Sequence, residues 1–330
     1  AALAAASVAA ASVAAACVAA LPLAGCRERQ VEREAPPVVE GSLVGADGVQ
    51  LFYRVTGQGD TIVVLHGGPA MSMSYLAADL APLAERRTLI FYDQRGSGRS
   101  QVVSDPNLLT ADRHVTDLEV LRAHFGIDRL TLLGHSWGVA LAGLYTLEHR
   151  GRVGRLILVS GFGPRLAPHV ETFTRRVASS IDSAGRARAA RLDSLLPVAD
   201  DPAAVCREAF RINFAGYFAD RAELDSLRGD PCDIPAEALR RSRAVSEYTL
   251  SSVGLYDWRE RLRGLQVPLL VIHGERDPVP VESAREWAEV APDARIVVIP
   301  GAGHFPFAEE REAFVGAVEE FLATPAPPRR

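Results

Sequence analysis

Short apolar segments alternate with helical segments along most of the chain. Continuous runs of apolar and β-branched residues predict strands that are buried on both faces of a sheet, and the alternating pattern at 51–55 predicts one further strand. Seven strands are expected, at residues 51–55, 61–65, 88–92, 130–134, 155–160, 268–272 and 294–299. Apolar positions at helical spacing predict helices at 73–84, 110–125 and 306–322. Strands that alternate with helices indicate an α/β fold with a mainly parallel, doubly wound sheet.

The alternation stops after the fifth predicted strand. From about residue 163 to residue 252 the sequence is helical in character and contains no clear strand. Because open α/β sheets bind ligands at the carboxyl ends of their strands, we interpret this insertion as a helical cap over that edge. The predicted organisation is a core at 47–163 and 253–323, a cap at 164–252 and a disordered tail at 324–330.

The start of the chain has a different character. Residues 1–26 are alanine-rich and uncharged and end in Leu-Ala-Gly-Cys, which resembles the lipobox of bacterial lipoproteins. That resemblance makes Cys26 the expected lipidation site and places the protein in the bacterial envelope, on its periplasmic or extracellular face. A cleaved secretory signal, an uncleaved anchor and a low-complexity tail are the alternatives. Residues 27–46, with mixed charges and two adjacent prolines, are expected to form a flexible tether.

The composition narrows the chemistry of the protein. A net charge of −5 at pH 7 and a pI near 6.0 predict no basic surface for nucleic acid. The chain contains no lysine, which excludes Schiff-base and P-loop chemistry. No group of His, Cys or acidic residues has the spacing of metal ligands, and no glycine-rich dinucleotide motif follows a strand. We therefore expect neither a metal nor a cofactor.

The most informative motif is Gly-His-Ser-Trp-Gly at residues 134–138. It follows a predicted strand and precedes a helical stretch of small residues, so Ser136 lies at the apex of a Gly-x-Ser-x-Gly turn. The turn needs its glycines, because a side chain at Gly134 or Gly138 would crowd the neighbouring strand and helix. This geometry exposes the hydroxyl at a helix N-terminus and makes Ser136 the candidate nucleophile, with a simple strand–helix turn as the alternative.

A serine nucleophile needs a base, and the base needs a group that orients it. Asp277 follows the strand at 268–272 and His304 follows the strand at 294–299, which matches the order serine, acid, histidine. Glu275 is the competing acid. His273 also follows a strand, but it comes too early in this order and is interpreted as structural.

Two backbone N–H groups are expected to stabilise the charge that develops on the substrate oxygen. The amide of Trp137 directly follows the nucleophile. Gly68 lies in the loop after the strand at 61–65, where a glycine lets the backbone approach the substrate. We interpret His66, in the same loop, as a brace.

Four segments together resemble the prolyl aminopeptidase (proline iminopeptidase) branch of the α/β-hydrolases. They are His-Gly-Gly-Pro at 66–69, Tyr-Asp-Gln-Arg-Gly-Ser-Gly-Arg-Ser at 92–100, Gly-His-Ser-Trp-Gly at 134–138 and Gly-Ala-Gly-His at 301–304. The resemblance implies an α/β-hydrolase fold and a serine hydrolase that uses Ser136, Asp277 and His304. It also implies that the turn at 92–100 is scaffold, in which Asp93 and Arg95 form a buried or half-buried pair.

Two features depart from that family's pattern. Ala70 stands where the family usually has glycine, and the cap lacks the Trp-x-x-Trp-Glu segment whose glutamate holds the free amine of the substrate. Glu171, Glu208 and Glu247 are candidate replacements, and Tyr248 beside Glu247 favours the last, although each also fits a solvated helix face. An aminopeptidase-like hydrolase of small amide, peptide or ester substrates is expected. A carboxylesterase or lactone hydrolase, and a non-catalytic ligand-binding lipoprotein, are the alternatives.

The cap contains two cysteines, Cys206 and Cys232. In an exported protein the oxidising environment favours a disulfide between them, and two separate buried thiols are the alternative. The expected partners are a small-molecule or short-peptide substrate and, through Cys26, the membrane.

Overall fold

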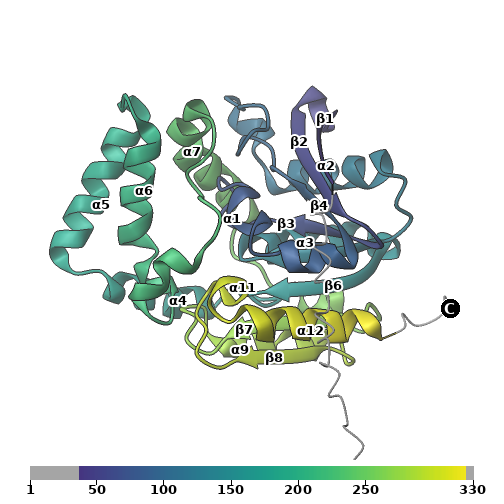
Figure 1. Cartoon of the computed structure of the whole chain (residues 1–330). Coiled ribbons are helices and arrows are strands. Elements are labelled where there is room, and N and C mark those ends of the chain that lie inside the picture. Colours follow the sequence, from purple (N-terminus) through teal and green to yellow (C-terminus); the bar gives the residue numbers. More distant parts are fainter. Residues whose placement is uncertain (1–36, 325–330) are drawn as a thin grey trace, which may run out of the picture. The chain divides into compact units, whose positions relative to one another are not determined.

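A computed structural model describes residues 37–324. Its strands form one eight-stranded sheet in the order β1-β2-β4-β3-β5-β6-β7-β8 (Figure 1). Strand β2 is antiparallel to β1 and β4, and the other neighbouring strands are parallel. The strands are β1 (Val38–Val44), β2 (Gln50–Gly57), β3 (Asp60–Leu65), β4 (Arg87–Tyr92), β5 (Leu130–His135), β6 (Val153–Val159), β7 (Leu269–Gly274) and β8 (Arg295–Ile299). All seven expected strands are present, and the predicted fold class is confirmed.

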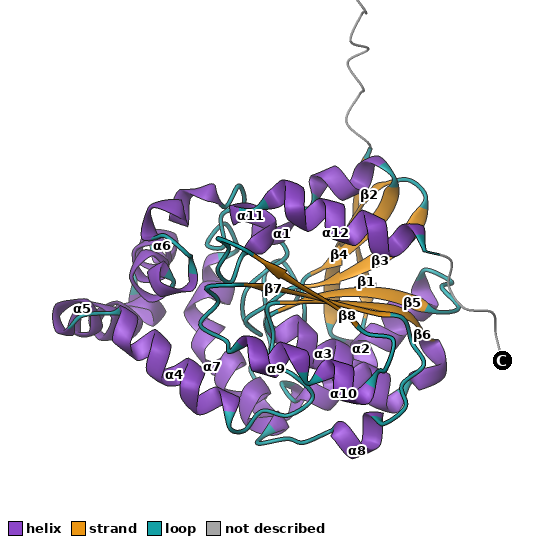
Figure 2. Cartoon of the chain, turned by 90° about the horizontal axis from the view of Figure 1, so that it is seen from below, coloured by secondary structure: helices purple, strands orange, loops and turns teal. Residues whose placement is uncertain are grey.

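Helices cover both faces of the sheet (Figure 2). One face carries α2 (Ala111–His124), α3 (Trp137–Glu148), α8 (Arg259–Leu262), α9 (Val281–Arg285) and α10 (Trp287–Val290). The other face carries α1 (Ser74–Ala77), α11 (Pro306–Glu309) and α12 (Arg311–Ala323). Each layer buries its own apolar cluster, with Leu121 and Tyr145 on the first face and Phe307 and Phe314 on the second. Because both faces are covered, the central strands are apolar along their length.

Four further helices lie between β6 and β7 and beyond one end of the sheet (Figure 1). They are α4 (His169–Ser180), α5 (Ser183–Leu195), α6 (Pro202–Asn213) and α7 (Ala236–Val253). Asp182 and Asp201 begin α5 and α6, where their carboxylates accept hydrogen bonds from backbone N–H groups of the first turn. These helices occupy the stretch for which the sequence predicts a cap.

The structure corrects the expected extent of the N-terminal tether. Strand β1 lies inside residues 27–46 and pairs with β2 along its whole length, from Val38 opposite Thr56 to Val44 opposite Gln50. The strand forms one edge of the sheet, and of its seven residues only Leu43 is buried. An edge strand with so little burial has no alternating apolar pattern, which is why the sequence does not reveal it.

Two expected helices are shorter than predicted. The segment at 73–84 is α1 followed by a 3₁₀ turn at Ala81–Glu85. A single α-helix cannot run through this segment, because Pro82 has no backbone N–H to donate to a helical hydrogen bond. The segment at 306–322 is divided into α11 and α12 at Glu310, whose φ of −129° and ψ of 58° are not helical.

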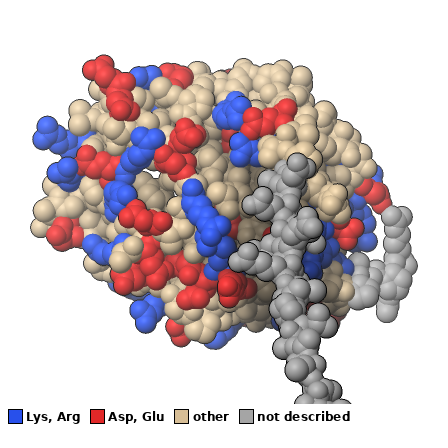
Figure 3. Space-filling view, in the orientation of Figure 1, with Lys and Arg blue, Asp and Glu red and all other residues tan. Residues whose placement is uncertain are grey.

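The surface of the described residues carries charges of both signs. On the face shown in Figure 3, arginine side chains are interspersed with Asp and Glu over the cap and the core. None of the helices between residues 37 and 324 is long and apolar enough to cross a membrane.

Candidate active site

The turn between β5 and α3 holds Ser136 in a strained backbone conformation, with φ of 55° and ψ of −116°. The backbone N–H of Ser136 donates to the carbonyl of Val159 at 2.9 Å, which ties the turn to β6. A Cβ atom at Gly134 would overlap the carbonyl of Gly138, and one at Gly138 would overlap the carbonyl of Leu65 in β3. The predicted need for both glycines is confirmed, and the turn leaves Ser136 partly exposed.

Asp277 and His304 meet across the ends of β7 and β8. Nδ1 of His304 lies 3.0 Å from Oδ1 and 3.1 Å from Oδ2 of Asp277, and both residues are 3% exposed. The N–H of Val279 also donates to Oδ1, at 2.8 Å. Burial by itself raises the pKa of Asp277, but the charges of His304 and His273 and the hydrogen bonds from His304 and Val279 hold the pKa below its usual range. The acid is therefore ionised beside an imidazole that it orients.

Neither Glu275 nor His273 takes the position of Asp277 beside Nδ1 of His304. Glu275 is exposed and accepts a hydrogen bond from the N–H of Gly301 at 3.3 Å. His273 is buried, and its Nε2 donates to the carbonyl of Val279 at 2.9 Å while lying 3.8 Å from Oδ2 of Asp277. His273 thus supports the loop that carries the acid.

A network of hydrogen bonds holds the loop after β3 in place. Nε2 of His66 accepts from the N–H of Gln94 at 3.0 Å, and the Gln94 side-chain amide donates to the carbonyl of His66 at 2.9 Å. Oε1 of Gln94 in turn accepts from the Trp137 indole at 2.7 Å. Burial lowers the pKa of His66 to about 4, so the ring is a neutral brace. Gly68 has φ of 41°, in the left-handed region, and Trp137 is the first residue of α3, where the backbone N–H has no intrahelical acceptor.

The loops of Ser136 and His304 meet through His135, the residue before Ser136. Nε2 of His135 lies 2.9 Å from the carbonyl oxygen of His304, and the centroids of the two imidazole rings are 4.9 Å apart. The carboxyl ends of β5 and β8 therefore hold Ser136 and His304 in neighbouring loops. Sequence reasoning did not assign a role to His135, although the residue lies inside the motif itself.

The cap contacts the loop of His304 directly. The N–H of His304 donates to the carbonyl of Tyr217 at 2.7 Å, and the Tyr217 ring lies edge-on to the imidazole with centroids 5.1 Å apart. Phe214 and Phe173 pack against Tyr217 in turn, at 4.8 and 5.9 Å. An aromatic wall from the cap therefore stands beside the histidine. The sequence indicated only that this stretch is helical in character, and it gave these aromatic residues no role in the site.

The carboxylate of Glu309 binds the loop of His304 to the cap. Oε2 of Glu309 accepts from the N–H groups of Ala219 and Gly303 at 2.7 and 2.9 Å, and Oε1 accepts from that of Phe305 at 3.0 Å. Burial raises the pKa of Glu309 against these hydrogen bonds. One side chain thereby joins the cap segment at Ala219 to the loop on each side of His304.

None of the three glutamates considered for an amine site is buried. Glu171 on α4 and Glu247 on α7 are exposed. Glu208 on α6 is 39% exposed and forms an ion pair with Arg188. Their surroundings are those of solvated helix faces, and no cap acid of this set is buried at the aromatic wall.

The structure corrects the expected Asp93–Arg95 pair. Both side chains are buried, but Arg95 binds Asp117 on α2 through two hydrogen bonds of 2.7 Å. Asp93 instead accepts from the N–H groups of Met73 and Arg99, at 2.8 and 2.7 Å. The two side chains therefore have different partners and do not form the expected pair.

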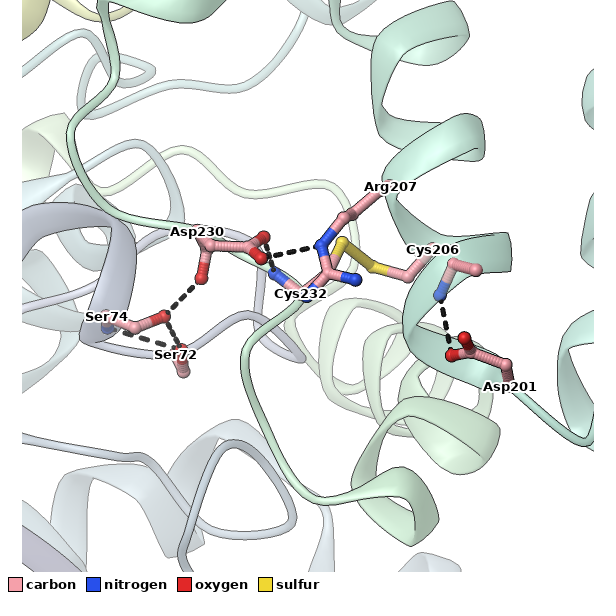
Figure 4. Close-up of a disulfide and its surroundings, with 8 residues drawn as sticks. Ser72, Ser74, Asp201, Cys206, Arg207, Asp230 and Cys232 are labelled. Atoms are coloured by element: carbon pink, nitrogen blue, oxygen red, sulfur yellow. Dashed lines mark hydrogen bonds and ion pairs between the residues drawn. A yellow bond between two sulfur atoms is a disulfide. The ribbon is translucent and has the colours of Figure 1, made fainter.

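The cap contains the disulfide Cys206–Cys232, which joins α6 to the segment before α7 (Figure 4). Asp230 in that segment accepts from the N–H of Cys232 and from Arg207, at 2.8 and 2.7 Å. Its carbonyl accepts from the hydroxyl of Ser74 at 2.9 Å. The disulfide therefore holds the cap segment that docks on α1, directly after the loop of Gly68.

Two further expectations concern the lipidation site and metal binding. Cys26 lies outside the described residues. Between residues 37 and 324, no group of three or more His, Cys, Asp or Glu is arranged to hold a metal ion.

The sheet order, the strained turn at Ser136 and the buried His304–Asp277 pair define an α/β-hydrolase. The profile of the alpha/beta hydrolase family matches residues 62–317. The chain belongs to this family and is a hydrolase.

Within this family, the chain is similar to proline iminopeptidases. The enzyme of that name from Lactiplantibacillus plantarum is 29% identical over 297 residues, which cover 84% of this chain and 98% of the relative. The structure of a proline iminopeptidase-related protein from Thermus thermophilus is 27% identical, with a TM-score of 0.59 and coverage of 87% and 98%. A thermophilic esterase from Thermogutta terrifontis, 24% identical, shares the fold with a TM-score of 0.62 and coverage of 86% and 98%.

Proposed function

We propose that the protein is a prolyl-aminopeptidase-like serine hydrolase in which Ser136, His304 and Asp277 act as nucleophile, base and acid. The observation that carries this proposal is the buried Asp277–His304 pair beside the strained turn of Ser136. Nδ1 of His304 donates to the carboxylate, which leaves Nε2 unprotonated and able to take the serine proton. The similarity to proline iminopeptidases supports the choice of substrate.

In the proposed reaction Oγ of Ser136 attacks the substrate carbonyl as its proton passes to His304. The N–H groups of Trp137 and Gly68 stabilise the negative oxygen that forms. His304 then protonates the leaving group, and an acyl-enzyme remains. Water attacks this ester by the same route and regenerates the serine.

The aromatic wall formed by Phe173, Phe214 and Tyr217 supports a compact apolar acyl group, such as a proline ring, beside His304. The exposed cap glutamates do not supply a buried partner for its amine. A carboxylesterase is the second candidate, because an ester acyl group would need the wall but no amine partner.

The test compares the full chain with its Ser136→Ala variant on proline 4-nitroanilide and on 4-nitrophenyl acetate. Turnover of the anilide that depends on Ser136 supports the aminopeptidase. Turnover of the ester alone assigns a carboxylesterase. Folded protein that neither turns over a substrate nor reacts with a fluorophosphonate contradicts catalysis and assigns a ligand-binding protein.

We also propose that the protein is a lipoprotein of the bacterial envelope, acylated on Cys26. The Leu-Ala-Gly-Cys sequence at 23–26 and the disulfide in the cap, which fits an oxidising compartment, support this proposal. Expression in a bacterial host fed an alkyne-tagged fatty acid tests it. The label is expected on the wild type and on Cys17→Ser but not on Cys26→Ser. Label retained on Cys26→Ser, or absent from the wild type, contradicts the proposal.

A further inference from the structure

A chain of three hydrogen bonds runs beneath the candidate active site. The N–H of Gly67 lies 2.6 Å from the hydroxyl oxygen of Tyr75, and that oxygen lies 2.7 Å from Nδ1 of His135. Nε2 of His135 lies 2.9 Å from the carbonyl oxygen of His304. Tyr75 is 0% exposed and His135 is 2% exposed. The chain therefore runs through the buried interior of the protein.

The polarity of this chain follows from its two ends. A backbone N–H can only donate, so the oxygen of Tyr75 accepts from Gly67 and its own proton is free to go to Nδ1 of His135. Nδ1 is then an acceptor, and the ring proton lies on Nε2, where it donates to the carbonyl of His304. A neutral imidazole is the side chain that accepts at one nitrogen and donates at the other. Burial, together with the charge of His304, lowers the pKa of His135 to about 3, which agrees with a neutral ring.

Three residues of this hydrogen-bond chain adjoin or belong to the groups proposed for catalysis. Gly67 precedes Gly68, His135 precedes Ser136, and His304 is the proposed base. A Cβ atom at Gly67 would lie 2.8 Å from the Tyr75 hydroxyl and 2.9 Å from Cβ of Ser136, so the first two loops converge closely. The chain thus joins the loops that carry the oxyanion donor, the nucleophile and the base.

Aromatic packing restricts the two side chains at the centre. The His135 ring lies 5.4 Å from the Phe305 ring and 5.0 Å from the Phe307 ring, measured between centroids. The Tyr75 ring is 6.3 and 6.4 Å from the same two rings. Rings held in this way have few alternative rotamers, so the hydrogen bonds of Tyr75 and His135 keep the loops that they join at fixed distances.

We propose that Tyr75 and His135 are positioning residues, which set the distances between the oxyanion loop, Ser136 and His304 through this hydrogen-bond chain. The proposal rests on the catalytic roles proposed above for Ser136 and His304. A displacement of about 1 Å between reacting groups can cost about 100-fold in rate. Loss of the chain should therefore lower kcat and leave substrate binding largely unchanged.

Three variants of the full chain break different parts of the hydrogen-bond chain. Tyr75→Phe removes the link between Gly67 and His135 and keeps the aromatic ring. In His135→Asn the side-chain oxygen can still accept from Tyr75, but the residue is too short to donate to His304. In His135→Gln the longer amide can donate to His304, but it does not also offer Tyr75 an acceptor at the position of Nδ1. Each variant is expected to lower kcat on 4-nitrophenyl acetate about 10- to 100-fold, with KM within about threefold.

Tyr145→Phe is the matched control. Tyr145 is also 0% exposed, and its hydroxyl donates to Glu119 at 2.6 Å on the α2 side of α3, away from the loops. Tyr145→Phe should lose about as much stability as Tyr75→Phe and should keep the kcat of the wild type. The double variant Tyr75→Phe, His135→Asn should lose no more activity than the more impaired of its two parents, because both break one chain. Single variants with kcat within twofold of the wild type, or losses that multiply in the double variant, would overturn the proposal.

Nitrogen-15 NMR of the histidine side chains tests the polarity without any turnover. The signal that disappears in His135→Gln should show a neutral ring with the proton on Nε2. A proton on Nδ1, or a charged ring at pH 7, would overturn the chain whatever the activity. The ester and the NMR signal do not depend on proline, so a protein that fails on proline 4-nitroanilide but meets these expectations refutes the aminopeptidase and keeps the positioning role.

Discussion

Replacing Asp277 by asparagine removes the charge beside His304 and changes the shape of the side chain little. Nδ1 of His304 lies 3.0 and 3.1 Å from the two carboxylate oxygens. At an effective dielectric constant of about 20, unit charges about 3 Å apart attract by about 5.5 kcal/mol. The amide dipole keeps part of this attraction, so we expect the transition state to lose about 4 kcal/mol, a fall of about 10³-fold in kcat/KM.

The pH dependence of this variant gives a second observable. The pKa of Asp277 is held below its usual range, so its contribution to stability is complete above the unfolded value of about 3.9 and is lost only as the pH falls through the lower folded value. In the wild type the acid is therefore charged across the working range. Asparagine does not titrate, so the stability that Asp277 contributes to the wild type and loses in acid should be absent from the pH dependence of Asp277→Asn.

The assay is hydrolysis of 4-nitrophenyl acetate by the full chain between pH 4 and 9. Glu275→Gln is the matched control, because Glu275 is a carboxylate two residues away that is exposed and bonds to Gly301 rather than to the base. We expect its kcat/KM to stay within about twofold of the wild type. Asp277→Asn within tenfold of the wild type, or an equal loss in Glu275→Gln, would refute the assignment of the acid.

Three changes test the scaffold, each by thermal unfolding. Asp117→Ala removes the buried carboxylate that binds Arg95 through two hydrogen bonds and should lower the free energy of unfolding by about 3–5 kcal/mol. Gly138→Ala forces a methyl group onto the carbonyl of Leu65 and should cost about 3 kcal/mol or more and abolish ester turnover. Cys232→Ser opens a loop with a sequence separation of 26 residues, for which chain entropy gives a loss of about 3.5 kcal/mol. Matched controls separate these effects from general damage. Asp193→Ala removes an exposed ion pair with Arg243 and should change stability by less than about 1 kcal/mol. Gly316→Ala adds a methyl group in open space on α12 and should be neutral or stabilising by up to about 1 kcal/mol. Cys206→Ser should match Cys232→Ser, with no further loss in the double variant. A loss in Asp193→Ala as large as in Asp117→Ala, a loss in Gly316→Ala as large as in Gly138→Ala, or a further loss in the double cysteine variant would contradict these contacts.

Much of this protein was readable from the pattern of its residues. A buried parallel strand is apolar along its length, and this local property located six of the eight strands, while the alternation at 51–55 located the antiparallel strand β2. Parallel strands also bring their carboxyl ends to one edge of the sheet. Ser136, Asp277 and His304 each follow such a strand, so their order along the chain was enough to place them in neighbouring loops. The glycines of the nucleophile turn were predictable for the same local reason.

Only the tertiary structure shows which residues far apart in the sequence pair or form hydrogen bonds with each other. Strand β1 is exposed and has no pattern of its own, so only its pairing with β2 defines it. Arg95 was expected beside Asp93, but the packing of α2 brings Asp117 to it instead. Likewise nothing near Tyr75 in the sequence indicates that it contacts His135, 60 residues away. Hydrophobic periodicity reports whether a side chain is buried, whereas its hydrogen-bond partner depends on how separate elements pack together.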